Sequence, residues 1–168
     1  MARKPQNSYN DAAMVKKVKR IYVDSTVVLG HFDISETRRQ ETDVFWDAVQ
    51  NGEVVVIASD VLDDEIKSEH ARDFLVSLPE SNVVWIDTTT ESTALAKLYI
   101  SEKVIGESSL NDCHHVALAT VFADGIVSWN MKDMVNRHKK YNNVNKAHGY
   151  PEIKIVTPDN FKEIHNEH

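Results

Sequence analysis

Short apolar segments that alternate with helical segments are the feature that most constrains the fold of this chain. EVVVIA, at residues 53–58, is a short continuous apolar run, which is typical of a strand buried on both faces. Further strands are predicted at residues 20–24, 82–87, 125–129 and 153–156. Helices are predicted at 35–50, from Ser59 through the acidic stretch that follows it, at 91–104, at 110–123, from 131 onward and in a short tail. The segment ARDFLVSL at 71–78 either continues the helix from Ser59 or follows it as a separate helix. Strands that alternate with helices predict an α/β fold with a parallel sheet of about five strands, covered on both faces.

Length and composition indicate one globular domain that follows a short basic extension. The chain has 168 residues, of which 42% are hydrophobic and 27% charged, enough to bury a core. Residues 1–19 are polar and basic, with a helix from Asp11 as one interpretation, and the domain is expected at 20–168. The net charge of −7 argues against tight non-specific binding to nucleic acid or to an anionic membrane, but it leaves room for a local basic patch.

The sequence also predicts a cytoplasmic protein. The N-terminal segment contains no apolar core of the kind found in signal peptides. No apolar run approaches the length that spans a bilayer, so no contact with a membrane is expected. Cys113 is the only cysteine of the sequence, which rules out an internal disulfide and fits a reducing compartment.

The acidic stretch SDVLDDEIKSEH, at residues 59–70, places four carboxylates in little more than one helical turn. With about 100° per residue and Val61 set at zero, Glu65 falls near ~40°, inside the apolar arc of the helix. The other three fall at about 200–300° and are expected to form a solvated face: Asp60, Asp63 and Asp64. A carboxylate on an apolar face is usually paired or bound to a cation, so Glu65 is a candidate site residue. A structural ion pair, or a side chain at the helix edge, is the alternative.

Two more acids stand at equivalent places in the predicted fold. Asp24 ends the first strand, and Asp112 lies in the first turn of a helix that is apolar almost all round. Ligands of parallel sheets bind outside the carboxyl ends of the strands. A turn or an interaction with the helix dipole would account for each acid alone. Three acids on one side of the sheet, counting Glu65, together favour a site.

Mg²⁺ and Mn²⁺ are the ions that suit such a set of acids. Both prefer oxygen ligands, keep several waters and need only a few carboxylates. A divalent ion also removes the repulsion that would otherwise raise the pKa of at least one acid. The reaction that such a site serves best is hydrolysis of a phosphodiester, in which the metal activates water and stabilises the developing negative charge.

Four longer segments occur in the order found in a known family. They are IYVDSTVVLGHFD, VVVIASDVLDDEI, NDCHHVALATVFADGIVSWNMKDMVN and VNKAHGYPEIKIVTPD. In these segments the chain resembles the PIN-domain ribonucleases, specifically the VapC-like toxins of type II toxin–antitoxin systems. The resemblance covers about residues 20–160 and is most specific in DCHHVALAT with IVSWN. It implies a PIN-like three-layer α/β/α fold and an acidic site that binds Mg²⁺ or Mn²⁺ and cleaves RNA. It also implies a cognate antitoxin as partner, and it leaves a homodimer open.

By position, Asp24, Glu65 and Asp112 match the first three acids of the family and are expected to be both catalytic and metal-binding. Many PIN domains carry a fourth acid after the fourth strand, where this chain has Asn130. Members of this subgroup often have Asn there, and its side chain can still hydrogen-bond a water bound to the metal, so Asn130 is expected to be a fourth catalytic residue. Three further residues are candidates for a supporting role: Asp133, His115 and Thr26. Asp133 could supply the missing charge or be an exposed helix acid, and His115 is expected to pack or orient instead of ligating.

RNA must be held by local basic surface, because the mean charge and the site itself are negative. The candidates in the domain are Arg38, Arg39, Arg137, Lys139 and Lys140, with KKVKR at 16–20 as a further patch. A non-catalytic PIN-like module that binds protein or RNA is the alternative function, since the fourth acid is absent. A phosphatase of the haloacid dehalogenase type is disfavoured, because that chemistry needs a second Asp where Thr26 stands.

Overall fold

The structure, a computed structural model, describes residues 18–165 and contains one five-stranded sheet. The predicted helix from Asp11 and most of the basic extension lie outside the described residues. The strands are β1 (Lys19–Val23), β2 (Val54–Ser59), β3 (Val83–Ile86), β4 (Gly125–Val127) and β5 (Lys154–Val156). All neighbouring strands are parallel, in the order β3-β2-β1-β4-β5. The predicted α/β/α architecture with about five parallel strands is therefore confirmed.

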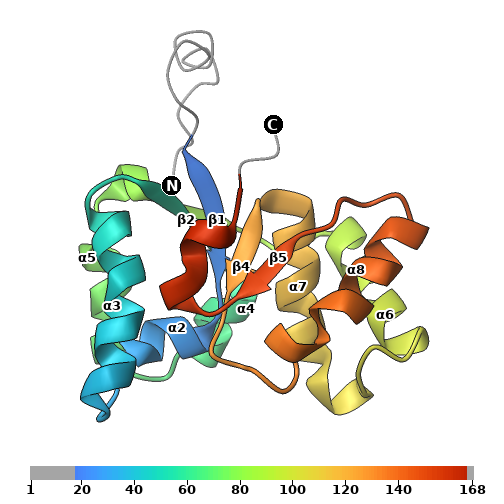
Figure 1. Cartoon of the computed structure of the whole chain (residues 1–168), viewed down its shortest axis with the longest axis horizontal. Helices are drawn as coiled ribbons and strands as arrows, with labels where there is room; N and C mark the ends of the chain where they lie inside the picture. The colour runs from blue at the N-terminus through green and yellow to red at the C-terminus, as the bar shows by residue number, and fades with distance from the viewer. Residues whose placement is uncertain (1–17, 166–168) are drawn as a thin grey trace, which may run out of the picture.

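Helices cover both faces of the sheet (Figure 1). The α-helices are α2 (Ser25–Gly30), α3 (Glu36–Gln50), α4 (Asp60–Glu65), α5 (Glu69–Ser77), α6 (Thr90–Ser101), α7 (Leu110–Phe122) and α8 (His138–Ala147). Short 3₁₀ turns are η2 (Glu80–Asn82), η3 (Glu107–Ser109), η4 (Val135–Arg137) and η5 (Pro158–Glu163). Helices α3 and α5 lie on one side of the sheet, and α6, α7 and α8 lie on the other.

The alternation of side chains along the strands creates two cores, one on each face. In β1, Ile21 and Val23 join the core formed with α3 and α5, while Tyr22 joins the core formed with α6 and α7. This is the pattern expected of a strand whose two faces are both buried. The polar hydroxyl of Tyr22 therefore lies in an apolar layer, and burying it without a partner would be costly.

The stretch after β2 forms two helices, α4 and α5, so ARDFLVSL belongs to a separate helix, as one of the two alternatives predicted. The first helix ends because Ile66 is extended, and Ser68 accepts from the amide of Ala71 to cap the new one. Two other elements differ from the predicted ones. The segment after β4 starts with turns, so that α8 begins only at His138. The short tail helix is the 3₁₀ turn η5. Within residues 18–165, none of the helices combines the length and the hydropathy needed to cross a membrane.

Candidate acidic site at the carboxyl edge of the sheet

Small polar side chains follow the three central strands at one edge of the sheet. Asp24 comes directly after β1, Ser59 ends β2 and Ser128 comes directly after β4. Because β1 lies between β2 and β4, these three residues stand side by side at the carboxyl ends of the strands. Asp24 and Ser59 are also the N-caps of α2 and α4. Free backbone N–H groups at a helix start thereby fix the direction of each side chain.

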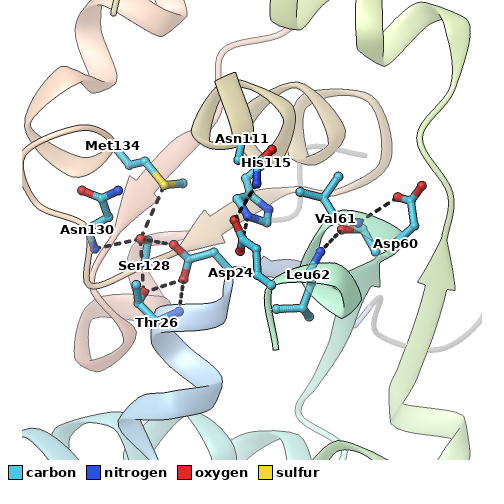
Figure 2. Close-up of polar contacts among 12 residues, drawn as sticks. Asp24, Thr26, Asp60, Val61, Leu62, Asn111, His115, Ser128, Asn130 and Met134 are labelled. Atoms are coloured by element: carbon cyan, nitrogen blue, oxygen red, sulfur yellow. Dashed lines mark hydrogen bonds and ion pairs between the residues drawn. The ribbon is translucent and has the colours of Figure 1, made fainter. Parts of the chain in front are cut away.

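Asp24 is held by hydrogen bonds to both of its carboxylate oxygens (Figure 2). Its Oδ1 accepts from the amide of Thr26 at 3.1 Å and from the Thr26 hydroxyl at 2.5 Å. Its Oδ2 accepts from the hydroxyl of Ser128 at 2.6 Å. The residue is only 3% exposed, and burial raises the pKa of its carboxyl, an effect that the charge of His115 and these hydrogen bonds offset in part. Thr26, a candidate for a supporting role, thus contacts Asp24.

Glu65 is fixed from the other side of the site by His115. His115 is 1% exposed on α7, and its Nε2 lies 2.8 Å from Oε1 of Glu65. The second oxygen, Oε2, accepts from the side-chain amide of Asn111 at 3.3 Å. Burial alone would raise the pKa of Glu65, but the hydrogen bond and the charge of His115 lower it. Burial would likewise lower the pKa of His115, but Glu65 raises it, so the two form an ion pair.

Tyr22 completes this arrangement from β1. Its hydroxyl lies 2.6 Å from Nδ1 of His115 and 2.6 Å from Oγ of Ser59. With His115 protonated, Nδ1 donates to the Tyr22 oxygen and Nε2 donates to Glu65, which leaves the tyrosine proton for Ser59. The chain Ser59–Tyr22–His115–Glu65 therefore links two strands and two helices, and it sets the direction of one acidic side chain.

Asp112 lies one helical turn from His115 on α7, and its carboxylate accepts no side-chain hydrogen bond among the described residues. Burial raises the pKa of Asp112 to about 6, an effect that His115 reduces and that the negative charges of Asp133, Asp24 and Glu65 increase. The four carboxylates therefore share one electrostatic environment, as expected for acids gathered at one edge. Asp133 is half-buried in a turn, and it is not the exposed helix acid of the alternative interpretation.

Asn130 follows β4 and closes the turn that carries Asp133. Its backbone amide donates to Oγ of Ser128 at 2.9 Å, and its Oδ1 accepts from the backbone amide of Asp133 at 3.1 Å. Figure 2 shows Asn130 beside Ser128, on the side of Asp24 that faces away from His115. The observed contact of Asn130 is thus the shaping of a turn.

The other acids of the stretch at 59–70 do not enter the site. Asp63 forms an exposed ion pair with Arg72, and Asp64 is exposed. Asp60 differs from the expected solvated face, because it is half-buried and its Oδ1 accepts from the amide and the hydroxyl of Thr88. It joins the start of α4 to the loop after β3. The helical phase that separates Glu65 from its neighbours agrees with its contact to His115.

The donor set suits a hydrated divalent ion and not a fully protein-ligated one. Within residues 18–165, no group of three or more His, Cys, Asp or Glu side chains is arranged closely enough to hold a metal ion. Mg²⁺ and Mn²⁺ nevertheless bind sites that supply one or two carboxylates and leave the remaining positions to water. Carboxylate oxygens are the ligands these ions prefer, and the pKa of Asp112 is raised by burial and, to a smaller extent, by the negative charges of Asp133, Asp24 and Glu65. The residues therefore fit such an ion.

The basic residues proposed to bind RNA are distributed over both ends of the sheet. Arg137 donates to the carbonyls of Lys132 and Val104, so its guanidinium already holds two loops together. Lys139 lines a cavity of about 390 Å³ with Asp124 and Lys154, which stand at the amino ends of β4 and β5. The structure does not bring Lys139 to the acids.

The remaining basic candidates also lie in different places, and one of them contacts a residue tied to the site. Lys140 lines a second hollow of about 320 Å³ with Glu102 and Lys103, also apart from the acids. Arg39 donates to the carbonyl of Asp33. Arg38 is the candidate nearest to the site through its contacts. It lies over the ring of Trp129, whose backbone amide donates to the hydroxyl of Thr26.

Two contributors to the site could not be recognised in the sequence. Tyr22 stands in an apolar strand and reads as an ordinary core residue, and only its contact with His115 shows its role. Ser128 is a small residue at a strand end, a position that a turn explains equally well. The sequence offered only their position as a hint, because Tyr22 lies close to Asp24 and Ser128 lies close to Asn130.

Comparisons with known proteins show the fold. A scan against protein-family models matches none of them, and a search of curated protein sequences finds no match. Among solved structures, the chain is similar to VapC20 of Mycobacterium tuberculosis, described as a toxin that cleaves the sarcin–ricin loop. That similarity has a TM-score of 0.50 with 13% identity, over 79% of this chain and 98% of that chain. VapBC2 of Rickettsia felis, bound to a DNA fragment of its promoter, gives a TM-score of 0.49 with 14% identity, over 81% and 96%.

The parallel sheet with helices on both faces defines an α/β/α architecture, and it carries acids at its carboxyl edge. More particularly, the similarity to VapC20 shows a VapC-like PIN-domain fold, which confirms the resemblance seen in the sequence at the level of the fold.

Proposed function

We propose that this chain is a metal-dependent endoribonuclease that hydrolyses phosphodiester bonds of RNA and acts as the toxin of a toxin–antitoxin pair. One observation carries the proposal: Asp24, Glu65 and Asp112 gather at the carboxyl edge of the sheet, where burial, together with the charges of Asp133, Asp24 and Glu65, raises the pKa of Asp112 to about 6. Partly buried carboxylates that repel one another favour the binding of a cation. The chain shares its fold with VapC20, which is described as a toxin that cleaves the sarcin–ricin loop, and this similarity supports the same conclusion.

Asp24, Glu65 and Asp112 would hold the ion together with its waters. A bound Mg²⁺ or Mn²⁺ would supply positive charge to the phosphate oxygens in the transition state and would activate water for attack.

The surrounding residues orient the acids before substrate arrives. Thr26 and Ser128 fix the two oxygens of Asp24, and His115 fixes Glu65. Carboxylates that are already held in place need no reorganisation during the reaction, which is the main source of electrostatic catalysis. Asp112 makes no such side-chain hydrogen bond among the described residues, so its carboxylate is the one left available to a ligand.

Incubation of purified, partner-free protein with total RNA tests the proposal directly. We expect discrete cuts when Mn²⁺ is present, no cuts when it is chelated, and none with the Asp24→Asn variant under either condition. Mapping of the cut ends would then identify the target. Cuts that persist unchanged in the variant would reveal a contaminating nuclease, and an absence of cuts with the parent protein would contradict the proposal.

The non-catalytic alternative has one observation in its favour. Asp24 is nearly inaccessible and both of its oxygens are engaged, which is the state expected if this acid only caps α2. A binding module of this kind would bind RNA or protein equally well with and without Mn²⁺ and would leave the RNA intact. The same incubation therefore separates the two functions.

The antitoxin is part of the proposal on the strength of the resemblance. Apolar side chains that such a partner could cover are exposed on α2 and in the loop after it: Leu29, Phe32 and Ile34, the last of them 99% exposed. Copurification of a small co-expressed protein that suppresses cleavage would support this part of the proposal.

A further inference from the structure

Trp129 is held in a fixed position beside the acidic site. Its backbone amide donates to the hydroxyl of Thr26 at 2.8 Å, and the same hydroxyl donates to Asp24. Its indole Nε1 donates to the hydroxyl of Thr42 on α3 at 2.9 Å. The ring also packs against the core of this face, so the tryptophan is anchored at both ends.

Arg38 lies over this ring. The guanidinium carbon is 3.9 Å from the ring centroid, within the range of a cation–π interaction. Arg38 and Thr42 are one helical turn apart on α3, so they contact the face and the edge of the same indole. The side chain is half-buried, and stacking on the ring restricts the directions in which its N–H groups can point.

The donors of this guanidinium have no partner among the described residues. The backbone of Arg38 is hydrogen-bonded to the side chains of Ser35 and Thr42, but no ion pair or hydrogen bond joins its guanidinium to any residue of 18–165. The ion pairs of that part of the chain involve other residues. By contrast, the guanidinium groups of Arg39, Arg72 and Arg137 all donate to carbonyls or carboxylates.

The position of Arg38 in its helix gives its charge no benefit from the helix dipole. It is the third residue of α3, and a positive charge in the first turn opposes the helix dipole. A stacked, half-buried cation with unused donors at an unfavourable place in a helix is better explained by an external anion than by stability.

We propose that Arg38, stacked on Trp129, forms a subsite that binds a phosphate of the RNA backbone next to the acidic site. The planar fork of a guanidinium matches two phosphate oxygens, and stacking holds it ready for such bidentate contact. The backbone amide of Trp129 is two hydrogen bonds from Asp24, through the Thr26 hydroxyl, so the ring that carries Arg38 belongs to a residue tied to the site. The inference rests on the proposed function in taking RNA as the ligand, and it names the residue that grips the strand.

Binding measured without catalysis tests the subsite separately from the nuclease activity. A labelled single-stranded RNA is titrated with Asp24→Asn protein in EDTA at several salt concentrations, and affinity is read from fluorescence anisotropy. The slope of log K against log salt is negative, and loss of one phosphate contact should reduce its magnitude by about 0.7 for a single strand. We expect this decrease, with weaker binding, in the D24N protein that also carries Arg38→Gln.

Three matched variants in the same background make the result specific. Arg72→Gln removes the same charge from an arginine that is already paired with Asp63, and it should keep the parental slope. Arg38→Lys should keep the slope, because the charge remains, but it should bind more weakly because the fork and the stack are lost. Trp129→Leu should weaken binding in the same way. Thermal unfolding of each variant establishes that the fold is retained.

The inference is overturned if Arg38→Gln leaves the slope unchanged, if Arg72→Gln lowers it equally, or if the protein binds no RNA. Its failure can be told from failure of the proposed function. Cleavage by the parent protein with an unchanged slope in the variant would contradict only the subsite. An Arg38-dependent slope in a protein that never cleaves RNA would contradict only the nuclease.

Discussion

At the scale of single residues, the acids of the site are held in different ways. Asp24 caps a helix and accepts from two hydroxyls, Glu65 is paired with a buried histidine, and Asp112 has mainly negative neighbours. The pKa of Glu65 is lowered, so the protein favours its ionised form, whereas burial raises the pKa of both Asp24 and Asp112. Asp112 is the one of these two without a side-chain hydrogen bond among the described residues, and its behaviour should report most directly on the state of the site.

Replacing Asp112 by Asn should stabilise the metal-free protein, and the gain should grow with pH. The pKa of Asp112 is about 6 in the folded chain and 3.8 in the reference state, so the folded chain holds this proton more tightly. Stability contributed by that proton is present below pH 4 and is lost as the pH rises toward 6. After a discount for partial exposure, we expect Asp112→Asn to gain about 1–2 kcal/mol at pH 7.5 and little at pH 4. Urea unfolding in EDTA at both pH values measures it, and a pH-independent difference would contradict the assignment.

Tyr22 should matter for activity beyond its contribution to packing. Tyr22→Phe removes the partner of Nδ1 of buried His115, which should cost about 1–3 kcal/mol of stability. Since His115 orients Glu65, we expect cleavage or metal affinity to fall about 10–100-fold as well.

Tyr99→Phe is the matched control for this variant. Tyr99, on α6, is equally buried and donates to Asn145 on α8. The Tyr99→Phe protein should lose a similar amount of stability and retain cleavage under conditions where both variants are folded. Equal loss of activity in the two variants would show that Tyr22 acts only through stability.

At the scale of elements, a close approach of α2 to α3 and to the turn after β4 holds the site together. Gly30 ends α2, and a Cβ atom there would lie 2.6 Å from Oγ1 of Thr42 and 3.2 Å from Nε1 of Trp129. The glycine is thus needed for the contact that fixes the tryptophan and, through it, Arg38.

Gly30→Ala should destabilise the protein by about 1–3 kcal/mol, the usual cost of forcing an added methyl group into a packed region. It should also weaken RNA binding, because Thr42 and Trp129 must move apart. Gly106→Ala is the control, since no atom lies within 4 Å of its added Cβ and its φ of −80° suits any residue. Chemical unfolding and RNA titration of both variants measure the effect. A Gly30 variant as stable as the control would show that the contact is loose.

The sequence predicted the long elements better than the short ones. Buried strands and long helices show a regular pattern of apolar side chains that can be read from the sequence alone. The helical pattern also separated Glu65 from the other acids of its stretch. Helix α2 was not predicted, because β-branched Thr26, Val27 and Val28 disfavour a helix. It forms because Asp24 caps it and the sheet and α3 bury its apolar side. The break at Ile66 depends on similar local capping.

At the scale of the whole molecule, the site exists because the topology brings strand ends together. Residues 24, 65, 112 and 128 are far apart in the chain, and the order β2-β1-β4 places their elements side by side. Parallel topology could be predicted from alternation alone, and with it the edge that carries the acids. The hydrogen bonds of Tyr22 and the stacking of Arg38 could not, because they depend on side-chain directions set only by the packed structure.

Binding of Mn²⁺ measures the central claim, that these acids form one cation site, most directly. Free Mn²⁺ is followed by electron paramagnetic resonance as parent protein is titrated, together with Asp24→Asn, Asp112→Asn and the exposed control Asp64→Asn. We predict one saturable site in the parent and in the Asp64 variant, and its loss or strong weakening in the Asp24 and Asp112 variants. Equal binding by all four proteins would contradict the account.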